Sequence, residues 1–282
     1  MHASPSERTR RPSPSLALPL ALPVVMTLAL VLLLILPPAG RAETFESPMA
    51  RARLVELYTS EGCSSCPPAD RWLAALTAGD DLWNAVVPVA FHVTYWDRLG
   101  WRDRLAQPDF DARQRRLARS SRAGVYTPGV FLDGDEWRSW RRAAPPASEA
   151  EDAGILRARI DGDALHISFR PAAGKVPQSR TLSAEVAWLT GASSEVRRGE
   201  NAGRRLRHEF AALSLEKHVL VADDGLWRTT VAARRPQSTD SPALAVWVTA
   251  ADGSLLQATG GWLDATASAP SAHAQAAGTP LP

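Results

Sequence analysis

The sequence has only two cysteines, Cys63 and Cys66, and this scarcity limits the sites that the chain can build. A four-cysteine zinc site is excluded because no further cysteine exists. A site of two cysteines and two histidines is disfavoured too, because no two of the six histidines have the His-x-x-x-His spacing.

A strong net charge is also lacking. The formal charge of the 282 residues is +2, and Lys175 and Lys217 are the only lysines among the basic residues. Residues 1–42 hold four of the 32 basic and one of the 30 acidic side chains, which leaves 28 and 29 in the rest of the chain. This balance favours neither nucleic acid nor an anionic membrane surface as a partner.

The N-terminal segment has the layout of a secretory signal. Residues 1–15 are polar with three arginines, residues 16–36 are almost wholly apolar, and small residues precede and include Ala42. We expect cleavage after about Ala42 and a periplasmic or secreted protein. The alternative is an uncleaved anchor in the inner membrane, although Pro19 and Pro23 shorten the unbroken apolar run.

The two cysteines follow a strand-like run and precede a helical pattern. Residues 53–59 have the composition of a strand, and apolar residues recur at helical spacing over residues 72–79. Two prolines stand after Cys66, where a helix tolerates them because its first amides have no internal partner. The sequence therefore places Cys63 at a strand-to-helix junction and Cys66 in the first helical turn.

The pattern that continues to residue 140 predicts an α/β domain. Residues 85–93 are apolar apart from His92, as expected of a strand in a parallel sheet covered on both faces. A helical pattern over residues 109–121 follows, and then a strand over residues 124–134 that is entered through Pro128 and ends in an Asp-Gly turn. This order is typical of an α/β fold over residues 50–140.

The second half of the chain changes to short strands. Residues 141–152 are rich in Ala, Pro, Ser and Glu and predict a linker, whereas residues 264–282 predict a disordered tail. Strands are expected at residues 155–160, 164–169, 182–190, 206–213, 226–233, 244–249 and 255–262. Their near-regular spacing predicts an all-β sandwich-like domain over residues 153–263.

The Cys-x-x-C pair is better suited to redox chemistry than to stabilisation. In the loop-entropy view a disulfide stabilises more as its loop lengthens, and this loop is minimal. A helix N-terminus supplies about half a positive charge and free amides, which favour a thiolate at Cys63. We therefore expect Cys63 to be the nucleophile and Cys66 to resolve a mixed disulfide on Cys63. No cofactor is needed.

Two other interpretations of the pair stay open. Cys63, Cys66 and His92 could hold copper or another soft metal, which would make the protein a carrier or binding module. A passive disulfide in a protein-interaction module is the other alternative.

Three motifs around the cysteines are similar to those of a known bacterial family. They are residues 57–70 (LYTSEGCSSCPPAD), 91–103 (FHVTYWDRLGWRD) and 125–128 (VYTP), and residues 198–204 (RGENAGR) extend the likeness to the second half. They resemble the exported family catalogued as domain of unknown function 1223, considered part of the thioredoxin-like superfamily. The resemblance covers residues 53–262 and implies a thioredoxin-like fold.

The resemblance also implies roles for residues near the cysteines. Thr127-Pro128 is similar to the superfamily's cis-proline element, which lies against the active-site disulfide and would leave the Thr127 backbone free to pair with a bound thiol substrate. The groove beside the cysteines would be lined by His92, Tyr95, Trp96, Asp97 and Trp101, at the rim where parallel strands end. The alternative is that Trp96 and Trp101 pack over the sheet and His92 is a core histidine.

The acidic residues near the cysteines depart from the thioredoxin pattern. Thioredoxins have a buried acid six residues before the first cysteine, but Leu57 occupies that position here and Glu56 lies one residue earlier, on the opposite face of a regular strand. We therefore assign no proton-relay role to Glu56. Glu61 would instead raise the pKa of Cys63 by like-charge repulsion.

Two further features have ordinary structural interpretations. Five arginines between residues 197 and 207 could form an anion-binding loop, but a solvated hairpin is the commoner outcome. Trp188, Trp227, Trp247 and Trp262 fall within strand patterns and are expected in the core.

The sequence thus predicts an extracytoplasmic thiol-disulfide oxidoreductase. Cys63 attacks, Cys66 resolves, and Thr127 with Pro128 positions the substrate. The expected partner is a protein that carries a thiol or disulfide, with no nucleic acid and no membrane contact beyond a possible N-terminal anchor.

Overall fold

The computed structural model describes residues 42–264 apart from 147–151, 176, 180 and 237–239. The expected signal segment, the expected tail and part of the expected linker lie outside the described residues. Within the described ranges, no helix has the length and apolar character needed to cross a membrane.

The chain has many strands and few helices. The first strands and helices are β1 (Glu43–Glu46), β2 (Arg53–Thr59), α2 (Pro67–Ala75), β3 (Val86–His92), α3 (Pro108–Ser120), β4 (Gly129–Leu132) and β5 (Asp135–Glu136). Seven more strands follow: β6 (Gly154–Asp161), β7 (Ala164–Pro171), β8 (Thr181–Glu195), β9 (Arg205–Asp223), β10 (Leu226–Ala232), β11 (Asp240–Thr249) and β12 (Leu255–Trp262). Short 3₁₀ helices are η1 (Leu76–Ala78), η2 (Thr94–Leu99) and η3 (Arg138–Arg141).

All 12 strands described belong to one mixed sheet. One path through it has the order β1-β6-β7-β10-β9-β3-β2-β4-β5, and β8, β11 and β12 branch from β9. The predicted parallel pair is present, because β2 and β3 run parallel from Arg53 opposite Val86 to Thr59 opposite His92. Strand β4 is antiparallel to β2.

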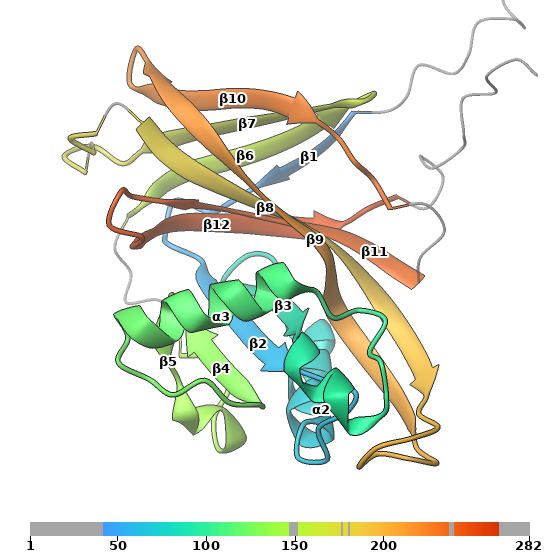
Figure 1. Ribbon diagram of the computed structural model, residues 1–282. Helices are drawn as coiled ribbons and strands as arrows, with labels where there is room; N and C mark the ends of the chain where they lie inside the picture. The colour runs from blue at the N-terminus through green and yellow to red at the C-terminus, as the bar shows by residue number, and fades with distance from the viewer. Residues whose placement is uncertain (1–41, 147–151, 176, 180, 237–239, 265–282) are drawn as a thin grey trace, which may run out of the picture. The chain divides into compact units, whose positions relative to one another are not determined.

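The expectation of a thioredoxin-like α/β domain followed by a separate sandwich is wrong. The overturning feature is strand β9, which pairs with β10 near one end and runs parallel to β3 at Ala211, so the sheet continues through both halves. Figure 1 shows β8 and β9 passing from the level of β10 to the level of the helices. Irregular register in the β8–β9 pair after Trp188 and after Thr190 allows the bend.

The hydrophobic core does not divide into one part for each half of the chain. One cluster packs β6, β7 and β10 against β8 and β11, and it includes Phe169 and Trp188. A second cluster joins β2, β3, β4 and both helices to the other sides of β8, β9 and β11, and it includes Phe91, Phe210 and Trp247. Strand β11 is buried without alternation over its last seven residues because both of its faces are covered.

Candidate functional site

The cysteines lie where β2 gives way to α2, as the sequence predicts. Cys63 and Cys66 form a disulfide with their Cα atoms 5.4 Å apart. Cys66 is the N-cap of α2, and Pro67 opens the helix. Both cysteines have no exposed surface, whereas Ser64 and Ser65 between them are exposed.

The Thr127–Pro128 peptide bond is cis, which confirms that prediction. Trp96 donates a 2.8 Å hydrogen bond from its indole nitrogen to the Thr127 hydroxyl. The same tryptophan lies against the cysteine loop, since a Cβ added at Gly62 would come within 3.1 Å of the Trp96 Cβ. Trp96 therefore connects the cis-proline segment to the loop of the cysteines.

Glu61 is a buried acid beside Cys63. Its Oε2 accepts a 2.6 Å hydrogen bond from the indole nitrogen of Trp101, and its Oε1 lies 3.6 Å from Nε2 of His208. Burial acts to raise the pKa of Glu61, but the polar groups of His208, Ser194 and Trp101 outweigh it and lower the pKa. The carboxyl group is therefore held as a carboxylate, the form that would repel a thiolate at Cys63.

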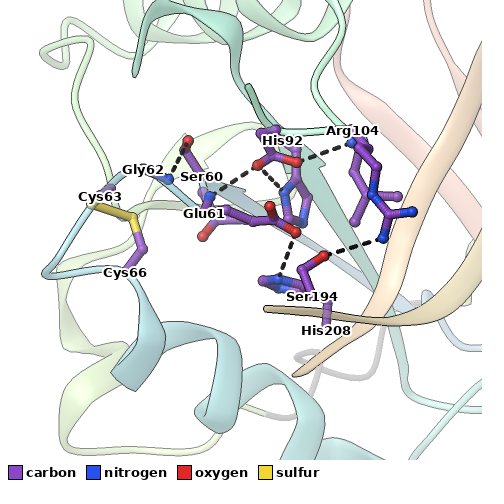
Figure 2. Close-up of polar contacts among 12 residues, drawn as sticks. Ser60, Glu61, Gly62, Cys63, Cys66, His92, Arg104, Ser194 and His208 are labelled. Atoms are coloured by element: carbon purple, nitrogen blue, oxygen red, sulfur yellow. Dashed lines mark hydrogen bonds and ion pairs between the residues drawn. A yellow bond between two sulfur atoms is a disulfide. The ribbon is translucent and has the colours of Figure 1, made fainter. Parts of the chain in front are cut away.

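His92 and Asp103 form a buried pair behind Glu61. Nδ1 of His92 lies 2.7 Å from Oδ2 of Asp103, and neither side chain is exposed. Asp103 also accepts a 2.9 Å hydrogen bond from the backbone N–H of Glu61. Burial opposes both charges, yet the attraction between them raises the pKa of His92 and lowers that of Asp103 to about 2. Figure 2 shows Glu61 between the disulfide and the two histidines, His92 and His208.

Asp70 lies one helical turn after Cys66, and its backbone N–H donates to the Cys66 carbonyl at 3.1 Å. Residues four apart share one helix face, so the Asp70 carboxyl lies on the side of Cys66. The Thr59 hydroxyl donates to Oδ1 of Asp70 at 2.8 Å, while Oδ2 is buried without a hydrogen bond, 3.9 Å from Nδ1 of His208. Burial raises the pKa of Asp70, which favours its protonated form.

The loop between β8 and β9 touches the cysteine loop from a distant part of the sequence. We call residues 196–204 the hairpin tip. Asn201 donates two hydrogen bonds of 2.9 Å, one to the carbonyl of Glu61 and one to that of Cys63. The Glu200 carboxylate accepts from Ser64, from the backbone N–H at 3.1 Å and from the hydroxyl at 2.7 Å.

The predicted groove residues take several different places. Trp96 and Trp101 contact the cysteine loop, and His92 is a buried histidine with an acidic partner. Asp97 accepts a 3.1 Å hydrogen bond from the Asp103 backbone, so it shapes the η2 segment. Tyr95 donates to Oε1 of Gln114 on α3 at 3.2 Å, and burial raises its pKa to about 12.

Sequence reasoning missed five residues of this site. They are Asp70, Asp103, Glu200, Asn201 and His208. The first two lie inside the motifs that resemble the family, and Glu200 and Asn201 lie in the 198–204 motif, so the motifs were the available signal. Nothing in the sequence showed that β9 would bring His208 under Glu61.

The soft-metal alternative has no contact in its favour. Among the residues that the structure describes, no group of three or more His, Cys, Asp or Glu side chains is arranged to hold a metal ion.

The fold and the site define a class: a single mixed sheet with a buried Cys-x-x-C disulfide at one strand-to-helix junction. The sequence assigns the chain to a family. Residues 54–249 match the family described as "Protein of unknown function (DUF1223)", and the chain belongs to that family. Among proteins with curated descriptions, none matches the sequence significantly.

Two solved structures are similar in fold. A protein of Agrobacterium tumefaciens solved by X-ray crystallography is 23% identical, with a TM-score of 0.52, and the match covers 77% of this chain and 95% of that one. HBP35 of Porphyromonas gingivalis is 15% identical, with a TM-score of 0.55 and coverage of 83% and 81%. At these identities the likeness extends to the fold alone.

Proposed function

We propose that this protein is an exported thiol-disulfide oxidoreductase that acts through Cys63 and Cys66. The observation that carries the proposal is the disulfide at a helix N-terminus, in a loop whose residues 61–64 are contacted by polar side chains from several separate parts of the chain. A loop this short contributes little stabilisation in the loop-entropy view, so stability alone does not explain such surroundings.

The N-terminal sequence pattern is consistent with the same proposal. Disulfides persist in oxidising compartments such as the periplasm and the extracellular space, and are rare in the cytosol. The signal-like pattern of residues 1–42 is consistent with such a compartment.

The exchange would proceed through a mixed disulfide on Cys63. A partner thiolate attacks Sγ of Cys63, the Cys63–Cys66 bond breaks, and Cys66 leaves as a thiolate that takes up a proton. The second thiol of the partner then attacks the mixed disulfide, releasing an oxidised partner and the reduced protein. Two electrons and two protons pass from the partner dithiol to the cysteines, and the reverse steps oxidise the protein.

Asp70 is our candidate for the group that supplies the proton that Cys66 takes up. It is buried one helical turn after Cys66 on α2, and burial raises the pKa of its carboxyl group. Pro128, preceded by its cis bond, and Thr127 would border the substrate, since Trp96 fixes the Thr127 hydroxyl next to the cysteine loop.

The test is the reduction potential of the Cys63–Cys66 couple, measured in glutathione buffers with metal content determined on the same sample. A reversible couple between about −270 and −120 mV supports the proposal, because known catalysts of this chemistry lie in that span. A potential below about −300 mV indicates a structural disulfide and contradicts it. Copper bound to the cysteines of the purified protein would contradict the proposal and indicate a metal carrier.

A trapping experiment separates the roles of the two cysteines. With Cys66→Ser, a mixed disulfide on Cys63 cannot be resolved and should accumulate with a cysteine-containing partner. The matched variant Cys63→Ser should accumulate none, and equal trapping by both variants would contradict the assigned roles.

A further inference from the structure

The hairpin tip, residues 196–204, contacts the loop that carries the Cys63–Cys66 disulfide. Cys63 and Cys66 have no exposed surface, so a thiol from solvent cannot reach either sulfur in this conformation. The tip contacts the cysteine loop on both sides of the first cysteine, at the carbonyls of Glu61 and Cys63 and at Ser64.

Asn201 makes the central contact of the tip. It is fully buried, and both hydrogens of its carboxamide are used, one on each carbonyl of the cysteine loop. Its Oδ1 accepts a 2.8 Å hydrogen bond from Arg204. The buried Asn201 carboxamide is therefore fixed in one orientation while the tip is in place. Any other orientation would break a hydrogen bond and leave a buried polar group unpaired.

The backbone of the tip is built to bring Asn201 to this place. Gly199 and Gly203 have φ angles of +79° and +81°, which side chains other than glycine rarely adopt. Gly199 also lies against Trp101, since a Cβ there would be 3.6 Å from the Trp101 Cβ. The 198–204 motif therefore serves the cysteine loop and is not merely a solvated turn.

We propose that the hairpin tip is a displaceable cover on the Cys63–Cys66 disulfide and that Asn201 and Glu200 select extended polypeptide thiols as partners. The inference rests on the proposed function for its chemistry. When the tip leaves, two carbonyl acceptors and the Ser64 N–H donor lose their partners. An extended peptide backbone offers both N–H and C=O groups to replace them, whereas a small thiol without a peptide backbone does not.

The first measurement is the rate at which dithiothreitol reduces the disulfide. Asn201→Ala removes both hydrogen bonds from this residue to the cysteine loop, which should raise the population of the uncovered form, and with it the rate, about ten-fold. Glu200→Ala, at an exposed position, should raise the rate by a smaller factor. Arg198→Ala is the control, because this exposed tip residue forms no hydrogen bond or ion pair with the cysteine loop, and its rate should equal that of the unaltered protein.

The second measurement replaces dithiothreitol with a reduced synthetic peptide of about twelve residues that carries two cysteines. The ratio of the peptide rate to the dithiothreitol rate should fall several-fold in Asn201→Ala. Circular dichroism checks that each variant is folded, and Glu200→Ala keeps the test valid if Asn201→Ala unfolds. Unchanged dithiothreitol rates in folded Asn201→Ala, or in Glu200→Ala, overturn the cover, and an unchanged ratio overturns the selection.

The cover and the oxidoreductase function can be tested independently of each other. A faster dithiothreitol reaction in the variants, with a reduction potential in the range of structural disulfides, would support the cover on a disulfide that is structural. A potential in the catalytic span with unchanged rates would support the oxidoreductase and overturn the cover.

Discussion

Behind the cysteines, His92 and Asp103 hold each other in their charged forms. Both side chains are fully buried, and their 2.7 Å contact is close enough for attraction to outweigh the cost of burial. The shifts have opposite directions, because the pKa of His92 is raised and that of Asp103 is lowered to about 2. Each shift makes the stability of the fold depend on pH.

The pair predicts a window of greatest stability. The contribution of His92 is complete below its ordinary pKa of about 6.5 and is lost as pH rises through the raised value. The contribution of Asp103 is complete above about 3.9 and is lost as pH falls through about 2. Urea unfolding from pH 2 to 9 should therefore show the pair stabilising the fold most between about pH 4 and 6.5.

Asp103→Asn removes the charge that raises the His92 pKa. In this variant the His92 imidazole should titrate at a lower pH than in the unaltered protein, as followed by NMR. His92→Gln should lose the decline in stability above about pH 6.5. A His92 titration that does not move in Asp103→Asn would contradict the pairing.

At the scale of the elements, Arg113 joins α3 to two strands. Its guanidinium donates to both carboxylate oxygens of Glu56 on β2, at 2.6 and 2.9 Å, and it pairs with Glu185 on β8. It also lies 5.0 Å from the ring centroid of Trp247 on β11. Burial acts against the charge, but the carboxylates of Glu56 and Glu185 raise the pKa of Arg113. Glu56 thus serves this ion cluster, in agreement with assigning it no proton-relay role.

Arg113→Met should destabilise the protein strongly. It leaves two buried carboxylates without their cation, and breaking a buried pair in this way costs about 3–5 kcal/mol. The control is Arg159→Met, which removes an ion pair with Asp161 whose partners are 45% and 46% exposed. An exposed pair contributes about 0–1 kcal/mol. Urea unfolding measures both changes, and equal losses would contradict a dominant role for the buried cluster.

Local sequence patterns predict most of the strands and helices, but they do not predict which distant strands pair. The strand at 53–59, the hairpin of β6 and β7, the parallel pairing of β2 with β3 and the strand-to-helix position of the cysteines are present. The prediction ended one strand at residue 213, but β9 continues to Asp223. Continuity through a bulge depends on partner strands, which a single segment does not specify.

The same limit applies to the site. Cys63, Cys66 and the cis bond at Pro128 follow from local motifs. Asn201 and His208 reach the site only because β8 and β9 extend past α2, and no spacing in the sequence encodes that distance. The apolar run of β11 agrees with the predicted strand in a sandwich. The structure differs in what covers the second face of β11, which packs against the strands next to the cysteines.

At the scale of the whole molecule, one core spans the segments on either side of residues 141–152. Leu189, Phe210, Trp247 and Leu255 are buried in the cluster that also contains the strands around the cysteines. Burial of a large apolar side chain contributes about 1.5–3 kcal/mol. Four such residues therefore contribute about 6–12 kcal/mol, comparable with the net stability of about 5–15 kcal/mol of a typical protein.

We therefore expect the segment of residues 50–140 to be unfolded when it is produced alone. Without β8, β9 and β11, the Arg113 cluster also loses Glu185, and Cys63 loses the hairpin tip. Amide NMR dispersion and urea unfolding would test this, with residues 43–264 as the folded control. A cooperative transition in the short segment would show that its own core suffices and that the second half only covers it. Its absence would mean that the loop of the disulfide folds only within the complete sheet, together with the hairpin tip that contacts it.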